Sequence, residues 1–216
     1  MNTSNSRRAF LLAVTWVAAQ ATFVSQASAD ETAKLLEEIA TARGGVRTMR
    51  ASFEQVRRIG LLATDVTSRG KVTLVRPDRL RWELLPPDAM TYWVGPEGLS
   101  YASGSAQASA DRETAGPMGR VLDDLLVFLG GDLGSLRARY ELTAKRQGQE
   151  LRIEARPRDE ALRKIVQSFE LVLASDRVTP VRVVVRETEK DFVRIRFSDV
   201  KHNVEVDAAS MRPPSR

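Results

Sequence analysis

The sequence has no cysteine and only one histidine among its 216 residues. The absence of cysteine excludes disulfides and thiolate metal sites, so the fold depends on its hydrophobic core alone. His202 would have to serve any histidine-based metal site or Ser-His relay by itself. We therefore interpret it as a surface or loop histidine at the start of the last strand, and expect no metal, no cofactor and no enzymatic activity.

Patterns of catalytic chemistry are also missing. The glycine pairs at 44–45 and 130–131 have no phosphate-cradling motif around them. Adjacent carboxylates occur at Glu37–Glu38 and Asp123–Asp124. Neighbouring positions on a helix do not face each other, so we interpret both pairs as solvated helix surface.

Long apolar runs are absent except near the N-terminus. Two arginines at 7–8 precede an apolar run from Ala9 to about Ala19, and Ala27-Ser28-Ala29 forms a small-x-small end. The run is too short and too interrupted for a permanent membrane span, so residues 1–29 are predicted to be a signal peptide cleaved before Asp30. The arginine pair fits Sec export and twin-arginine export alike, and both lead to the periplasm.

The net charge of the whole sequence is +5. An exported destination argues against nucleic acid as a partner. The basic residues are dispersed along predicted strands rather than gathered in one run, so we interpret them as solvated faces that could help contact with acidic membrane surfaces.

The chain from Asp30 onward begins with the spacing of an amphipathic helix. Apolar residues recur at helical intervals from Asp30 to about Arg50, and the pair at 44–45 is expected to break or cap the helix. From Ala51 the period changes to two, which predicts strands with one apolar and one wet face. Further alternating segments are centred on residues 72–74, 80–84, 92–94, 140–144, 151–155, 169–173, 181–185 and 193–197.

Two mid-chain segments break this alternation. Residues 101–119 are rich in Ser, Ala and Gly and predict a mobile loop. Residues 121–129 predict a short amphipathic helix stopped by Gly130–Gly131, with a helical turn near 133–136. Two helices on one side of a long, curved antiparallel sheet make the predicted fold class α+β.

The predicted sheet carries more large apolar side chains than one short covering helix requires, among them Trp82, Met90, Tyr92 and Trp93. These side chains fit an ordinary core sealed by two helices, and they also fit a container for an apolar ligand. The residue pattern alone leaves both readings open.

Four motifs, in order, resemble the LolA family of periplasmic carriers, which ferry lipoproteins from the inner to the outer membrane of Gram-negative bacteria. They are ASFEQ at 51–55, GKVTLVRPDRLRWELLPP at 70–87, WVGPEGLSYASG at 93–104 and HNVEVDAASMRPP at 202–214. For residues 30–216 the resemblance implies an incomplete antiparallel β-barrel closed by a helical lid over an apolar cavity. It also implies three partners: acylated lipoproteins, an inner-membrane lipoprotein-releasing ABC transporter and an outer-membrane receptor. The chain is expected to act as a monomer.

The resemblance also gives expected site residues. Arg76, before Pro77, matches the family arginine that holds the lid shut through backbone carbonyls, a task that suits a rigid fork of donors. The expected lid residues are Val121, Leu122, Leu125, Leu126 and Phe128. Alternation assigns the lining of the cavity to Phe53, Val72, Leu74, Leu80, Trp82, Met90, Tyr92, Val94, Phe169, Leu171, Val183 and Ile195.

Three alternative functions stay open at this point. The chain could be a similar carrier of another lipid or of a hydrophobic biosynthetic product. It could also be a sensor module that binds mislocalised lipoproteins, although such a module usually needs a further domain. An enzyme ranks last.

Overall fold

The computed structural model of the protein describes residues 15–62, 64–104, 106–110, 116–130 and 133–214. The side chains of residues 15–28, 62, 110 and 116–121 lie outside this description. In the part of the chain that is described, no helix is both long and apolar enough to cross a membrane.

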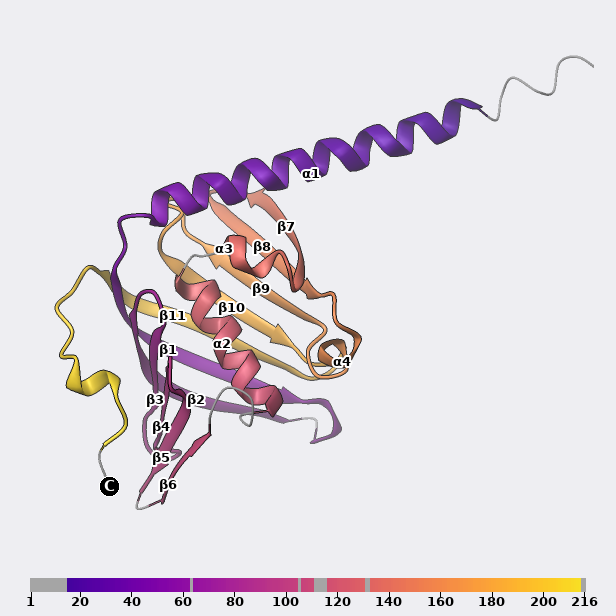
Figure 1. Ribbon diagram of the computed structural model, residues 1–216. Helices are drawn as coiled ribbons and strands as arrows, with labels where there is room; N and C mark the ends of the chain where they lie inside the picture. The colour runs from indigo at the N-terminus through magenta and orange to yellow at the C-terminus, as the bar shows by residue number, and fades with distance from the viewer. Residues whose placement is uncertain (1–14, 63, 105, 111–115, 131–132, 215–216) are drawn as a thin grey trace, which may run out of the picture.

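One antiparallel sheet of eleven strands forms the body of the molecule, in the order β6-β5-β4-β3-β2-β1-β11-β10-β9-β8-β7. The sheet is open because its edges, β6 and β7, do not pair with each other, and it curves around helix α2 (Figure 1). The strands are β1 Thr48–Ile59, β2 Thr64–Val75, β3 Arg79–Leu84, β4 Met90–Gly95, β5 Gly98–Ser103, β6 Ala106–Ala110, β7 Tyr140–Gln147, β8 Glu150–Pro157, β9 Ser168–Leu173, β10 Pro180–Arg186 and β11 Phe192–His202.

The two faces of the sheet differ in chemistry. Directly opposed residues on antiparallel strands point to the same face. Val72 lies opposite Trp82, and Trp82 lies opposite Tyr92, so these three form one row on the inner face, the face that α2 covers. Their chain neighbours, such as Lys71 and Arg81, point to the outer face. The inner face forms the hydrophobic core with the helices.

Helix α1, Thr15–Arg43, passes through the expected cleavage point and lies along the β7 side of the sheet. Leu35, Leu36 and Ile39 are buried under it, and the hydroxyl of Thr32 accepts a hydrogen bond from the Ala144 amide at 3.3 Å. Because a helix covers the β7 edge here, that edge is shielded from pairing with another strand. The break expected at Gly44–Gly45 is confirmed, because α1 ends at Arg43; the expected continuation of helix to about Arg50 was wrong, because β1 begins at Thr48.

Helix α2, Gly116–Gly130, lies across the inner face (Figure 1). Short elements complete the fold: α3 Leu133–Leu136, α4 Glu160–Arg163, and the 3₁₀ turns η1 Gly60–Leu62 and η2 Ala209–Met211. The helical turn predicted near 133–136 is present as α3. Helix α4 was not predicted, although Asp159 caps it by accepting a hydrogen bond from the Leu162 amide at 2.8 Å.

Two further expectations from the sequence were wrong. Part of the predicted mobile loop 101–119 belongs to strands β5 and β6, which pair from Leu99–Ala110 to Ser103–Ala106. The side chains of this hairpin are small, so the sequence shows little apolar alternation there. Main-chain hydrogen bonds pair the two strands. His202 was expected at the start of the last strand, and it stands at the end of β11.

Candidate functional site

All twelve residues predicted to line a cavity lie on the inner face of the sheet. The ladder places them in connected rows, for example Leu74 opposite Leu80 and Val183 opposite both Leu171 and Ile195. Met90 and Tyr92 are partly exposed, and the other ten are buried, namely Phe53, Val72, Leu74, Leu80, Trp82, Val94, Phe169, Leu171, Val183 and Ile195. The ring of Phe53 stacks on that of Trp82 with centroids 4.0 Å apart.

The concave side of the sheet is occupied by the apolar side chains of α2. Those that are buried are Leu122, Leu125, Leu126, Phe128 and Leu129. Leu129 was expected in this helix but not among the lid residues, and the side chain of Val121 lies outside the described residues. Phe128 stacks on Phe169 with centroids 5.5 Å apart and meets Tyr140 edge to face at 6.3 Å. In this arrangement the apolar side of α2 covers the inner face of the sheet.

Among the described residues, the side-chain hydrogen bonds of Arg76 go to the end of α1 and not to α2. Its Nη1 donates to the carbonyl of Arg43 at 2.7 Å and to that of Val46 at 3.1 Å. Both carbonyls belong to the C-terminal end of α1 and the turn after it, where carbonyl groups lack helical partners. Arg76 therefore caps α1 and fixes the position of Arg43.

Arg43 makes the contact with α2. Its Nη1 donates to the Phe128 carbonyl at 2.9 Å, in the last turn of α2, and its Nη2 donates to the Val178 carbonyl at 3.2 Å. The side chain is only 2% exposed. The pKa of Arg43 is lowered to about 10, mainly by this burial and also by the charge of Arg76, while the charge of Asp176 opposes the shift. A cation is favourable at a helix C-terminus because of the helix dipole.

The sequence contained a signal for Arg43. The residue lies four positions after Ile39 and seven after Leu36, so it belongs to the buried stripe of α1. A charged residue in such a stripe needs a polar partner, but the partners are carbonyl groups distant in sequence. Only the structure reveals them.

Asp124 is a buried carboxylate in α2, and its interpretation as solvated surface was wrong. It is 0% exposed; the Tyr140 hydroxyl donates to its Oδ2, and Arg139 Nη2 lies 2.6 Å from its Oδ1. Burial raises the pKa of Asp124, although the hydrogen bond from Tyr140 and the charge of Arg139 oppose this. Asp124 precedes Phe128 by one helical turn, which places it on the apolar side of α2.

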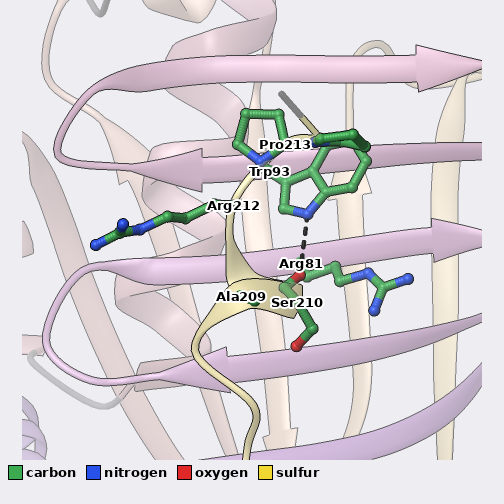
Figure 2. A pocket seen from close by; sticks show the side chains of 7 residues that line it. Arg81, Trp93, Ala209, Ser210, Arg212 and Pro213 are labelled. Carbon is green, nitrogen blue, oxygen red and sulfur yellow. Dashed lines mark hydrogen bonds between the residues drawn. The ribbon is translucent and has the colours of Figure 1, made fainter. Parts of the chain in front are cut away.

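Trp93 points to the outer face, away from Trp82. Its Nε1 donates to the Ser210 carbonyl at 3.1 Å, and the C-terminal segment covers its ring (Figure 2). A hollow of about 520 Å³ beside it is lined by Arg81, Trp93, Ala209, Ser210, Arg212, Pro213 and Pro214. Figure 2 shows the guanidinium groups of Arg81 and Arg212 pointing in different directions. These side chains therefore do not converge on a shared ligand position.

His202 is half-buried at the end of β11. Burial lowers its pKa, while Asp176 raises it and Arg43 lowers it. Among the described residues, no three His, Cys, Asp or Glu side chains gather as a metal site would require.

A family model described as "Outer membrane lipoprotein carrier protein LolA" matches residues 44–212 of the chain. Among curated proteins, none matches the chain.

Several solved structures have a similar fold at low sequence identity. One is the MucA/MucB complex of Pseudomonas aeruginosa, with 14% identity over 85% of this chain and a TM-score of 0.49; the match spans 61% of the length of the other chain. A putative outer membrane lipoprotein-sorting protein domain from Vibrio parahaemolyticus has 11% identity over 85% of this chain and 97% of its own, with a TM-score of 0.48. A LolA superfamily protein from Nitrosomonas europaea has 10% identity over 84% and 97%, with a TM-score of 0.46.

Proposed function

The chain belongs to the LolA family of outer membrane lipoprotein carrier proteins, and from this premise we propose that it is a non-enzymatic periplasmic carrier. It would bind the acyl chains of lipoproteins on the inner face of its sheet and shuttle them from the inner to the outer membrane. Export by the Sec or twin-arginine route, with cleavage before Asp30, belongs to the same proposal. The proposed partners are a lipoprotein-releasing ABC transporter and an outer-membrane receptor, with the carrier acting as a monomer.

The proposal rests mainly on how α2 packs against the inner face of the sheet. Leu122, Leu125, Leu126 and Phe128 are buried against an apolar sheet rather than against other long helices. Burying an acyl chain contributes roughly 0.8 kcal/mol per CH₂ group. A permanently open apolar face would therefore bind several chains too tightly for release. Because cargo has to displace α2, part of that gain is offset and binding stays reversible.

Two arginines in series would hold the lid. Arg76 donates to the Arg43 carbonyl, and Arg43 donates to the Phe128 carbonyl at the end of α2. The lid can leave only if the hydrogen bond from Arg43 to α2 breaks. A guanidinium suits this task because it stays charged and its donors are held in a fixed plane. In the proposed mechanism Arg43 is the direct latch and Arg76 positions it.

Two tryptophans on neighbouring strands provide the test. Trp82 is on the inner face and Trp93 on the outer face. In a Trp93→Phe background, a brominated fatty acid should quench Trp82 fluorescence at micromolar concentrations. In the matched Trp82→Phe background, the same fatty acid should leave Trp93 nearly unquenched. Equal quenching of both, or of neither, would remove the inner face as the binding surface.

A further inference from the structure

The sheet gathers basic residues that are dispersed along the sequence onto one surface. Arg50 of β1 lies opposite Lys201 of β11, and Ser52 of β1 lies between Ser198 and Lys71 of β2, so all of these point to the outer face. We name as the basic face six outer-face residues of β1, β2, β10 and β11, namely Arg50, Lys71, Arg186, Arg194, Arg196 and Lys201. Five of them are exposed, and Arg194 is half-buried against the ring of Phe192.

The positive charge of the basic face is not neutralised locally. On these four strands, Glu54 of the outer face pairs with Arg69 at 3.3 Å and Asp65 pairs with Arg58 at 2.9 Å. One further carboxylate, Asp199, is exposed in the irregular stretch of β11 between Ser198 and Lys201. On the neighbouring strand, Glu170 is held by Arg152 and Arg182. Within the described part of the chain, none of the six basic-face residues forms an ion pair with a carboxylate. Unpaired like charges on a rigid sheet repel one another, so an anionic partner is favoured there.

We propose that the basic face docks the protein on an anionic phospholipid bilayer. The charges are spread over four adjacent strands, which suits a surface with delocalised negative charge. An acidic protein partner is less favoured, because protein interfaces centre on aromatic or aliphatic anchors. The exposed large apolar residues of the described chain, Leu61, Val66, Tyr101 and Ile165, are not on the outer face of these strands.

A hollow in the middle of the basic face strengthens the choice of phospholipid. It has a volume of about 420 Å³, and its charged lining residues are Glu54, Arg69, Lys71 and Arg196, of which Glu54 and Arg69 pair with each other at 3.3 Å. The two cations without a carboxylate partner among the described residues, Lys71 and Arg196, can take a phosphate group there. The inference goes beyond cargo binding, since the inner face is on the other side of the sheet. Docking in this way concentrates the protein at the membrane while α2 stays turned away from the bilayer.

Vesicle sedimentation tests the proposal. The protein without residues 1–29 is mixed with phosphatidylcholine vesicles, with or without 30% phosphatidylglycerol. We expect binding to the anionic vesicles only, and its loss in 0.5 M NaCl, because salt screens the attraction. The triple variant Lys71→Gln, Arg196→Gln, Lys201→Gln should lower the partition coefficient about a hundredfold, since each basic residue contributes about a fivefold factor near such a surface.

A second triple variant separates the basic face from net charge. Arg158→Gln, Arg163→Gln and Lys164→Gln remove three exposed cations in and beside α4, and should change the partition coefficient less than threefold. Circular dichroism melting confirms that each variant folds. Equal losses in the two triple variants, or equal binding to neutral vesicles, would overturn the proposal. It would also be overturned if the protein bound an acidic protein but did not bind anionic vesicles.

Discussion

At the scale of single residues, the position of α2 on the sheet depends on polar groups that are buried among apolar side chains. Arg43 is 2% exposed and bonds two backbone carbonyls from different elements. Hydrogen bonds that involve a charged group contribute about 1.5–3 kcal/mol, and a buried partner left alone is costly. Removing Arg43 should therefore affect the end of α2 more than the sheet.

Arg43→Met should accelerate amide hydrogen exchange in α2 residues 125–130 by about tenfold or more, following from the energy of a charged hydrogen bond. Arg76→Met should act in the same direction, since Arg76 holds the Arg43 carbonyl. The two effects should not add in the double variant, because one contact acts through the other. Arg47→Met, at an exposed site, is the control. Additive effects of the two substitutions on exchange, or unchanged exchange in α2, would refute the proposal that Arg76 acts on α2 through Arg43.

Asp124 predicts a dependence of stability on pH. Burial raises the pKa of its carboxyl in the folded protein, so the folded state binds the proton more tightly than the unfolded state does. Stability from this group is then present at low pH and is lost as the pH rises through the raised pKa. Urea unfolding between pH 4 and 8 should show the wild type losing stability relative to Asp124→Asn as the pH increases.

The neighbouring carboxylate serves as the control for this titration. Asp123 is half-buried, and Asp123→Asn should leave the pH dependence of the unfolding free energy close to that of the wild type. If the wild type instead gained stability relative to Asp124→Asn as the pH rose, the predicted direction of the pH dependence would be wrong.

At the scale of elements, the proposed function requires α2 and cargo to compete for the inner face of the sheet. Leu125→Ala should weaken the seating of α2, since truncating a buried leucine destabilises packing by about 2–5 kcal/mol. The affinity for a fluorescent fatty acid should therefore rise at least tenfold. Leu171→Ala removes a contact on the sheet instead, and should lower the affinity. Fluorescence titration measures both, and a weaker affinity in Leu125→Ala would contradict the competition.

The sequence predicted the elements whose side chains alternate strongly. Rows such as Leu80-Trp82-Leu84 set the face of each strand, and the ladder agrees with that assignment. It missed β5 and β6, where small residues carry little apolar contrast. It also missed Arg43 and misread Asp124, because the partners of a buried charge come from elements that only tertiary structure brings together.

At the scale of the whole molecule, one sheet separates two kinds of surface. The inner face is apolar and covered by α2, and the outer face carries the unpaired charges of the basic face. This division follows from strict alternation along the strands, since each chain step moves a side chain to the other face. Under the two proposals, the covered apolar side would bind cargo and the charged side would dock on the membrane.

The most direct measurement is native mass spectrometry, with lipid extraction, of the protein purified from its own periplasm. The account predicts an acylated lipoprotein bound to a monomer, and a larger bound fraction in Leu125→Ala, whose lid is weakened. Recovery of a different lipid or hydrophobic product would change the proposed cargo but would leave the proposed carrier role in place. Recovery of no acylated or apolar molecule, from the wild type and from Leu125→Ala alike, would contradict the account.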